Sequence, residues 1–114
     1  MSQSEPTIFS KIVSGEIPAE ILFQNDSAIV IKDIHPKAPV HLLAITKLPF
    51  EHIDALMADK NNENTLWELF DALYQVAKQM NLSSYRLVTN CGRQSGQSVP
   101  HLHVHLLAGT ELAE

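Results

Sequence analysis

The sharpest pattern of polar and hydrophobic positions in the sequence is an alternation near its C-terminal end. Within residues 99–107, histidines take turns with aliphatic residues: His101, Leu102, His103, Val104, His105 and Leu106. Successive side chains of a strand point to opposite faces, so the alternation predicts a strand with three imidazoles on one face and three aliphatic groups on the other. We expect the aliphatic face to pack and the imidazole face to react.

Shorter runs of β-branched and other apolar residues predict the rest of a sheet. Strands are expected over residues 20–24, 27–33, 40–47 and 84–90. Asn25 and Asp26 separate the first two, and they suit the tight turn of a hairpin. In the last strand two sets of side chains alternate, Tyr85, Leu87 and Thr89 against Arg86, Val88 and Asn90.

Apolar residues at helical spacing predict three helices. A short one covers residues 7–13, with Thr7 as its cap and Gly15 at its end. Another covers 51–57, starting near His52. The longest follows the polar run 59–64 and ends near Asn81. Its core-facing stripe is Leu66, Leu69, Phe70, Leu73, Val76, Ala77 and Met80.

Two aromatic side chains lie on a flank of the long helix, outside that stripe. Trp67 and Tyr74 are two turns apart, so they stand together on the helix surface. Large exposed aromatics often mark an interface. We therefore expect a homodimer.

Composition narrows the class of protein. The 114 residues, 45% of them hydrophobic, suit a single domain over 1–114. A net charge of -5 without a basic run argues against nucleic-acid binding. The sequence has neither a secretory signal nor an apolar run near the ~20 residues of a membrane span. The single cysteine, Cys91, excludes an internal disulfide and an all-cysteine zinc site. These features predict a cytoplasmic protein that does not bind a membrane.

The segment before the histidines is suited to an anion. Residues 90–98 combine glycines with hydroxyl and amide side chains, and glycines allow backbone N–H groups to converge on a phosphate. Such residues also occur in ordinary turns, so the signal is weak alone and gains weight only beside the histidines.

Three readings of the histidines remain at this point: structure, metal binding and catalysis. A single ion held by all three is disfavoured, because His101 and His105 would lie on the order of 13 Å apart along a strand. Two of them, such as His101 and His103, still suit a metal. Catalysis on an anion is favoured by the adjoining loop.

The segment 96–107 resembles the signature of the histidine triad (HIT) family, and its closest branch is the Hint-like nucleoside phosphoramidate hydrolases. The likeness extends to residues 8–12, 16–19, 33–36 and 38–41, so it covers nearly the whole chain. It implies an α+β fold: an antiparallel β-sheet of about five strands, with one long and one or two short helices.

The resemblance also implies a role for individual residues. His103 would be the nucleophile, His105 and Ser98 would bind phosphate oxygens and help to protonate the leaving group, and His101 and His41 would orient His103. Asp33 would bind the ribose. The other nucleotide-binding residues would be Phe9, Ile12, Ile31, Ile34, Asn90, Gly96 and Gln97. From the residues alone, other roles stay open: turn formers for Asp33 and Asn90, core for Phe9 and Ile12, and structural support for His41.

The implied activity is hydrolysis of a purine nucleoside 5′-phosphoramidate through a covalent nucleotidyl-histidine, with no cofactor. The alternatives are a dinucleoside polyphosphate hydrolase of the same family, a slow nucleotide-binding regulator, or a metal-binding protein that uses His101 and His103. The third histidine, His105, favours a hydrolase, because nucleotidyltransferase relatives commonly carry glutamine there.

Two segments depart from the family pattern. The link over 46–52 is longer than expected, which leaves the course of that loop open. The tail over 109–114 is shorter than in many relatives, and Ala108 and Thr110 replace an expected glycine and basic residue. The choice of leaving group is therefore open.

Overall fold

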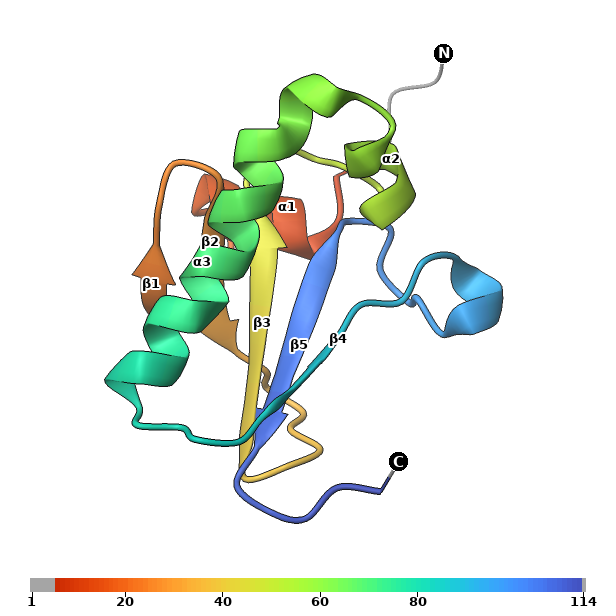
Figure 1. Cartoon of the computed structure of the whole chain (residues 1–114). Coiled ribbons are helices and arrows are strands. Elements are labelled where there is room, and N and C mark those ends of the chain that lie inside the picture. The colour runs from red at the N-terminus through yellow and green to blue at the C-terminus, as the bar shows by residue number, and fades with distance from the viewer. Residues whose placement is uncertain (1–5, 114) are drawn as a thin grey trace.

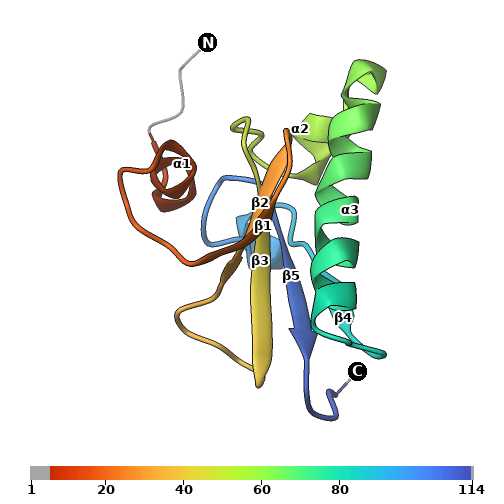
Figure 2. The ribbon, with the colours of Figure 1, turned by 90° about the vertical axis from the view of Figure 1, so that its left-hand side faces the viewer.

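The computed structural model describes residues 6–113 and has a five-stranded sheet with helices on both faces. Figures 1 and 2 show α3 lying along one face and α1 on the other. The helices and strands are, in chain order, α1 (Ile8–Ser14), β1 (Ile21–Gln24), β2 (Ala28–Lys32), β3 (Val40–Thr46), α2 (Ile53–Met57), α3 (Glu63–Gln79), β4 (Arg86–Val88) and β5 (His103–Ala108), with short 3-10 turns at Lys60–Asn62 and Arg93–Ser95.

The strand order is β1-β2-β3-β5-β4, and every neighbouring pair is antiparallel. This confirms the expected α+β fold with a five-stranded antiparallel sheet. The register of β3 on β5 pairs Leu43 with His105 and Ile45 with His103, and the histidine strand is an interior strand between β3 and β4.

A hydrophobic layer lies on each face of the sheet. The larger one is under α3, which lies over β1, β2 and β3, and in it Leu69, Leu73 and Val76 form one cluster with the aliphatic residues next to the histidines. Leu102, Val104 and Leu106 are all buried there, so the expected packing face is confirmed. The smaller layer is under α1 and consists of Phe9, Ile29, Ile31, Leu43 and Ile45. Both faces of β2 are therefore covered.

Local capping explains where α1 begins and ends. The Thr7 hydroxyl accepts from the Ser10 N–H at 3.1 Å, and the Ser10 side chain bonds back to the Thr7 backbone. Gly15 takes a left-handed conformation (φ 87°) at the C-terminal end. The predicted ends of this helix are confirmed. Similarly, the ring of His52 accepts from the Ala55 N–H and caps α2.

The long helix ends one residue earlier than the hydrophobic stripe suggests. Asn81 has φ 57°, a left-handed conformation that stops the helix. Met80 lies just beyond Gln79 and is 39% exposed. The prediction that Met80 belongs to the core is therefore wrong, because its backbone has already left the helical path.

Two strands are shorter than predicted. β5 starts at His103 rather than at residue 99, because Pro100 has no N–H for the sheet ladder and the chain bends there. β4 ends at Val88, where the Thr89 hydroxyl donates to the carbonyl of His103 at 2.7 Å in place of a backbone group. Within the described residues, no helix is both long and apolar enough to span a bilayer.

Candidate active site

A cleft of about 520 Å³ opens on the face of the sheet opposite α3. The expected site residues that line it come from β5, the start of β3, the end of β2 and the loop after β4: His103, His105, His41, Asp33, Asn90, Gly96 and Ser98. Tertiary folding thus brings together groups from four separate segments. The other six expected site residues do not line it: Phe9, Ile12, Ile31, Ile34, Gln97 and His101.

The ring of His103 is held with one nitrogen free. Its Nδ1–H donates to the carbonyl oxygen of His101 at 2.7 Å, so the lone pair of a neutral ring is on Nε2. The edge of Phe9 packs against it, with ring centroids 4.8 Å apart. Burial lowers the pKa of His103 below 6.5, against the opposing effects of its backbone hydrogen bond and the charge of Asp33. The ring is therefore neutral and nucleophilic at neutral pH.

The ring of His101 is buried and lies outside the cleft. This residue lies just before β5 and is only 1% exposed, but its ring is on the same side of the sheet as His103, because Phe9 of α1 contacts both rings, at 6.3 and 4.8 Å between centroids. Its Nε2–H donates to the Thr46 carbonyl at 2.7 Å, and Nδ1 lies 3.4 Å from the Thr7 hydroxyl. Both nitrogens are engaged within the protein, which argues against a metal held by His101 and His103.

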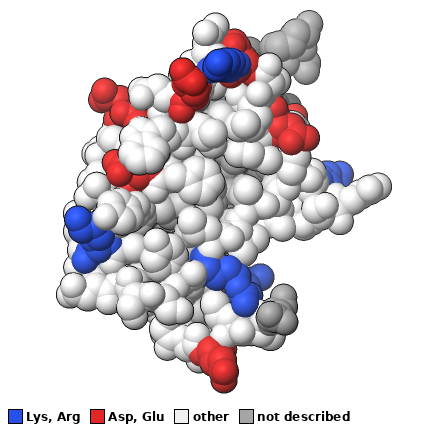
Figure 3. Space-filling model, in the orientation of Figure 1, with Lys and Arg blue, Asp and Glu red and all other residues white. Residues whose placement is uncertain are grey.

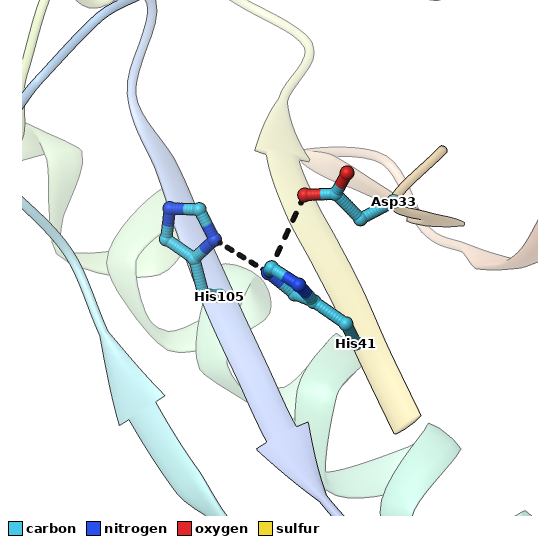
Figure 4. Close-up of side chains that lie close together, drawn as sticks. All are labelled: Asp33, His41 and His105. Atoms are coloured by element: carbon cyan, nitrogen blue, oxygen red, sulfur yellow. Dashed lines mark hydrogen bonds and ion pairs between the residues drawn. The ribbon is translucent and has the colours of Figure 1, made fainter. Parts of the chain in front are cut away.

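His41 and His105 form a second set of ring contacts, with Asp33 beside them (Figure 4). The backbone N–H of Lys37 donates to His41 Nδ1 at 3.0 Å, which requires the ring proton to be on Nε2. His41 Nε2 lies 2.9 Å from His105 Nδ1 and 3.3 Å from Asp33 Oδ2. Since His105 accepts at Nδ1, its own proton is on Nε2.

The environment keeps His105 neutral. Burial lowers its pKa to about 4, and the neighbouring His103 and His41 add to the effect, while Asp33 opposes it. At neutral pH this ring is a hydrogen-bond donor through Nε2–H. His105 does not act as a cationic acid, because a second proton on its Nδ1 would point at the Nε2–H of His41.

The same three side chains could be considered as metal ligands, since Asp33, His41 and His105 each bring a donor atom within 4.8 Å of the others. A metal needs the lone pair of His41 Nε2, however, and the Lys37 N–H holds the proton on that nitrogen. The donor set therefore does not fit a metal, and the cluster is better described as a hydrogen-bond chain.

The buried side chain of Gln97 holds the loop over residues 90–98 in place by hydrogen bonds. This side chain is 7% exposed; its Oε1 accepts from the Gly92 N–H at 2.8 Å, and its Nε2 donates to the carbonyls of Glu51 at 2.7 Å and Val99 at 3.0 Å. Gln97 thus shapes the loop rather than facing a ligand, in contrast to the expected nucleotide contact. Gly96, with φ 100°, lets the chain turn into the cleft beside Asn90.

The hydrophobic residues expected around a base are divided by the fold. Phe9 and Ile12 of α1 cluster with Ile31 of β2, and Phe9 packs against the rings of His103 and His101. Ile34 instead sits in the loop between β2 and β3 and is 79% exposed. Ile31 and Ile34 are therefore in different environments, the first buried and the second exposed to solvent, although they are only three residues apart in the sequence.

Six residues without an expected site role also line the cleft: His35, Lys37, Arg86, Val88, Leu107 and Leu112. For Arg86 a signal was present in the sequence, since it alternates with Val88 and Asn90 and so shares their face. Leu112 had no such signal, because it reaches the cleft only through the fold of the tail, where the Arg86 guanidinium donates to the Ala113 carbonyl.

Known proteins resemble this chain along its whole length. The family model described as "Scavenger mRNA decapping enzyme C-term binding" matches residues 6–112. The purine nucleoside phosphoramidase of Escherichia coli (strain K12) is 37% identical over 111 residues, 96% of this chain and 92% of that protein. Adenylylsulfatase HINT1 of Arabidopsis thaliana is 40% identical over 108 residues, 94% of this chain and 74% of that protein.

Among solved structures, a HIT family hydrolase from Clostridium thermocellum matches with a TM-score of 0.89 and 37% identity. The match covers 98% of this chain and 97% of that one. The same architecture is therefore found in a HIT family hydrolase of similar size.

Proposed function

This chain belongs to the histidine triad (HIT) family and is a HIT-family nucleotide hydrolase. We propose that its substrate is a purine nucleoside 5′-phosphoramidate. The observation that carries the proposal is the 2.7 Å hydrogen bond from His103 Nδ1 to the His101 carbonyl, which leaves Nε2 unprotonated in the cleft. The phosphoramidase relative, 37% identical, supports the choice of substrate.

The reaction divides into two displacements at the α-phosphorus. In the first, His103 Nε2 forms a bond to phosphorus and the P–N bond breaks; the amine leaves with the electron pair and takes a proton from solvent in the open cleft. In the second, water attacks phosphorus, gives up a proton, and His103 leaves as a neutral ring. The positive charge of the intermediate is stabilised by the His101 carbonyl, which keeps its bond to Nδ1–H.

The remaining groups stabilise the phosphoryl oxygens. His105 donates through Nε2–H, and Ser98 and the loop N–H groups lie on the same cleft. The role expected for His105 in protonating the leaving group changes to hydrogen bonding, because a neutral ring that gave up Nε2–H would become an imidazolate. We assign the ribose to Asp33, which lines the cleft, and the base to the side of the cleft next to Phe9, which packs on His103 and clusters with Ile12 and Ile31.

A panel of three adenylyl compounds tests the proposed substrate. The protein is incubated with an adenosine phosphoramidate, with adenylylsulfate and with a dinucleoside polyphosphate, and release of AMP is followed for each. We expect the phosphoramidate to have the highest kcat/KM. Preferential cleavage of the dinucleotide would favour the alternative activity within the family, and no cleavage of any of them would favour a binding protein.

The lowered pKa of His103 predicts how the rate varies with pH. The ring attacks only when it is unprotonated, and a pKa below 6.5 means that the neutral form persists as the pH falls through that value. We expect kcat/KM for the phosphoramidate to change little between about pH 8 and about pH 7, and to have its acidic midpoint below pH 6.5. The profile is measured against a blank without enzyme. A midpoint at or above pH 6.5 would contradict the assignment.

We also propose that the protein is a homodimer through α3 and β4. Trp67 is 67% exposed and, with Tyr74, Tyr85 and Leu87, lines an apolar groove of about 350 Å³ between the two elements. Charged side chains are sparse at the centre of this face and lie mostly around its margin (Figure 3). β4 is also an edge strand, whose outer backbone groups are available to a second copy.

The oligomeric state is tested by sedimentation at micromolar concentration. We expect a dimer for the wild type and a monomer for Trp67→Glu, because the substitution buries a charge in the interface. Met57→Glu is the matched control, since Met57 is a similarly exposed apolar residue on α2, and it should leave the dimer intact. A monomeric wild type, or a dimeric Trp67→Glu variant, would contradict the proposal.

A further inference from the structure

One proton in the cleft lies between two acceptors. The Lys37 N–H fixes the proton of His41 on Nε2, and this nitrogen is 2.9 Å from His105 Nδ1 and 3.3 Å from Asp33 Oδ2. Figure 4 shows the imidazole and the carboxylate approaching the same edge of the His41 ring. A single N–H cannot point directly at both, so Asp33 and His105 compete for it.

The outcome of this competition affects His105, which ends the chain of donors. Its ring is packed against His103 with centroids 5.1 Å apart, and both line the cleft. Hydrogen bonds in a chain polarise one another, so stronger donation into Nδ1 makes the Nε2–H a stronger donor. The share of the His41 proton given to His105 therefore determines how strongly His105 can stabilise a phosphoryl oxygen.

Asp33 is the member of this chain that a ligand can reach. Its backbone N–H donates to the His41 carbonyl at 3.0 Å and its Oδ1 accepts from the His35 N–H at 2.8 Å, which holds the carboxylate against His41. Within residues 6–113, Oδ2 has His41 as its polar neighbour, and Asp33 lines the cleft. A hydroxyl that donates to Oδ2 would take the place of the His41 proton.

We infer that the ribose hydroxyls of the substrate act on the phosphoryl end of the site through Asp33, His41 and His105. When the hydroxyls donate to Asp33, the carboxylate attracts the His41 proton less, and that proton is committed to His105. The bond from His105 to the phosphoryl group then strengthens. This inference rests on the proposed function, which places ribose at Asp33, and it makes Asp33 a positioning residue for the chemical step as well as a sugar contact.

The kinetic test compares an adenosine phosphoramidate with its 2′,3′-dideoxy analogue. The measured quantity is the single-turnover rate of nucleotidyl transfer to His103 at saturating substrate, which excludes binding and product release. For the wild type we expect the dideoxy analogue to react about 3- to 10-fold more slowly, the range expected for strengthening one hydrogen bond in a polar chain. If Asp33 only binds sugar, the two saturating rates are equal and only the apparent affinity differs.

A variant separates this coupling from other effects of the missing hydroxyls. In Asp33→Asn the carboxylate charge is gone, so we expect the two substrates to react at equal saturating rates. Asp26→Asn is the matched control: Asp26 is an exposed carboxylate in the turn between β1 and β2, and its removal should leave the ribose dependence unchanged. A dideoxy effect that is the same in Asp33→Asn as in the wild type would overturn the inference.

A second measurement needs no turnover and uses AMP and 2′,3′-dideoxy-AMP as probes. We expect AMP to shift the ¹⁵N resonance of His105 Nδ1 further than the dideoxy probe does, because the His41 bond to it shortens. Equal shifts from two bound probes would overturn the inference and leave the proposed function intact. If neither probe binds, both the inference and the proposed function fail.

Discussion

His103→Ala should reduce turnover of an adenosine phosphoramidate by on the order of 10⁴- to 10⁶-fold, as is typical when the covalent nucleophile of an enzyme is removed. The loss should occur in kcat, because the attacking nitrogen is gone while the loop, Asp33 and the hydrophobic layer under α1 remain. AMP should therefore still bind. The wild type, quenched during turnover, should carry a nucleotidyl group on the peptide that contains His103, and the variant should carry none.

A histidine outside the cleft provides the control for this experiment. His52 caps α2 and does not line the cleft; His52→Asn keeps a side chain that can cap and should leave kcat unchanged. An adduct found on His105 in place of His103, or full activity in His103→Ala, would contradict the assigned nucleophile.

Gln97→Ala should lower the free energy of unfolding by about 2–4 kcal/mol, because it leaves the Gly92 N–H and the Glu51 carbonyl without their buried partner. Urea unfolding, followed by circular dichroism at a fixed protein concentration, measures this change. Affinity for AMP should also fall, through loss of the loop conformation.

Gln94 offers a matched comparison in the same loop. It is exposed, so Gln94→Ala should change stability by less than about 0.5 kcal/mol. If Gln97→Ala were as stable as Gln94→Ala and lost only AMP affinity, Gln97 would be a direct ligand contact, contrary to the hydrogen bonds described above.

Local signals predicted several elements correctly, and the helix α1 is an instance. Its cap at Thr7 and its end at Gly15 depend on residues a few positions apart, so the sequence contains all the information needed. The burial of Leu102, Val104 and Leu106 followed in the same way from alternation.

The predictions that failed involve contacts between distant segments. The strand was expected from residue 99, but the Leu102 N–H bonds to the Phe50 carbonyl and His101 is held by Thr46, so the chain joins the sheet only at His103. The resemblance implies that Gln97 contacts the nucleotide, whereas its side chain donates to the carbonyl of Glu51, 46 positions away, a contact that no local pattern indicates.

The sequence by itself determined the family, the α+β class and the face of the histidine strand that packs, since periodicity and motif spacing follow from the order of residues alone. The tertiary structure decided which nitrogen of each imidazole carries the proton. That depends on the Lys37 N–H at His41, on the His101 carbonyl at His103, and on the His41 Nε2–H at His105. Hydrogen-bond partners a few ångströms apart in space fix a tautomer, and no local pattern in the chain records those distances.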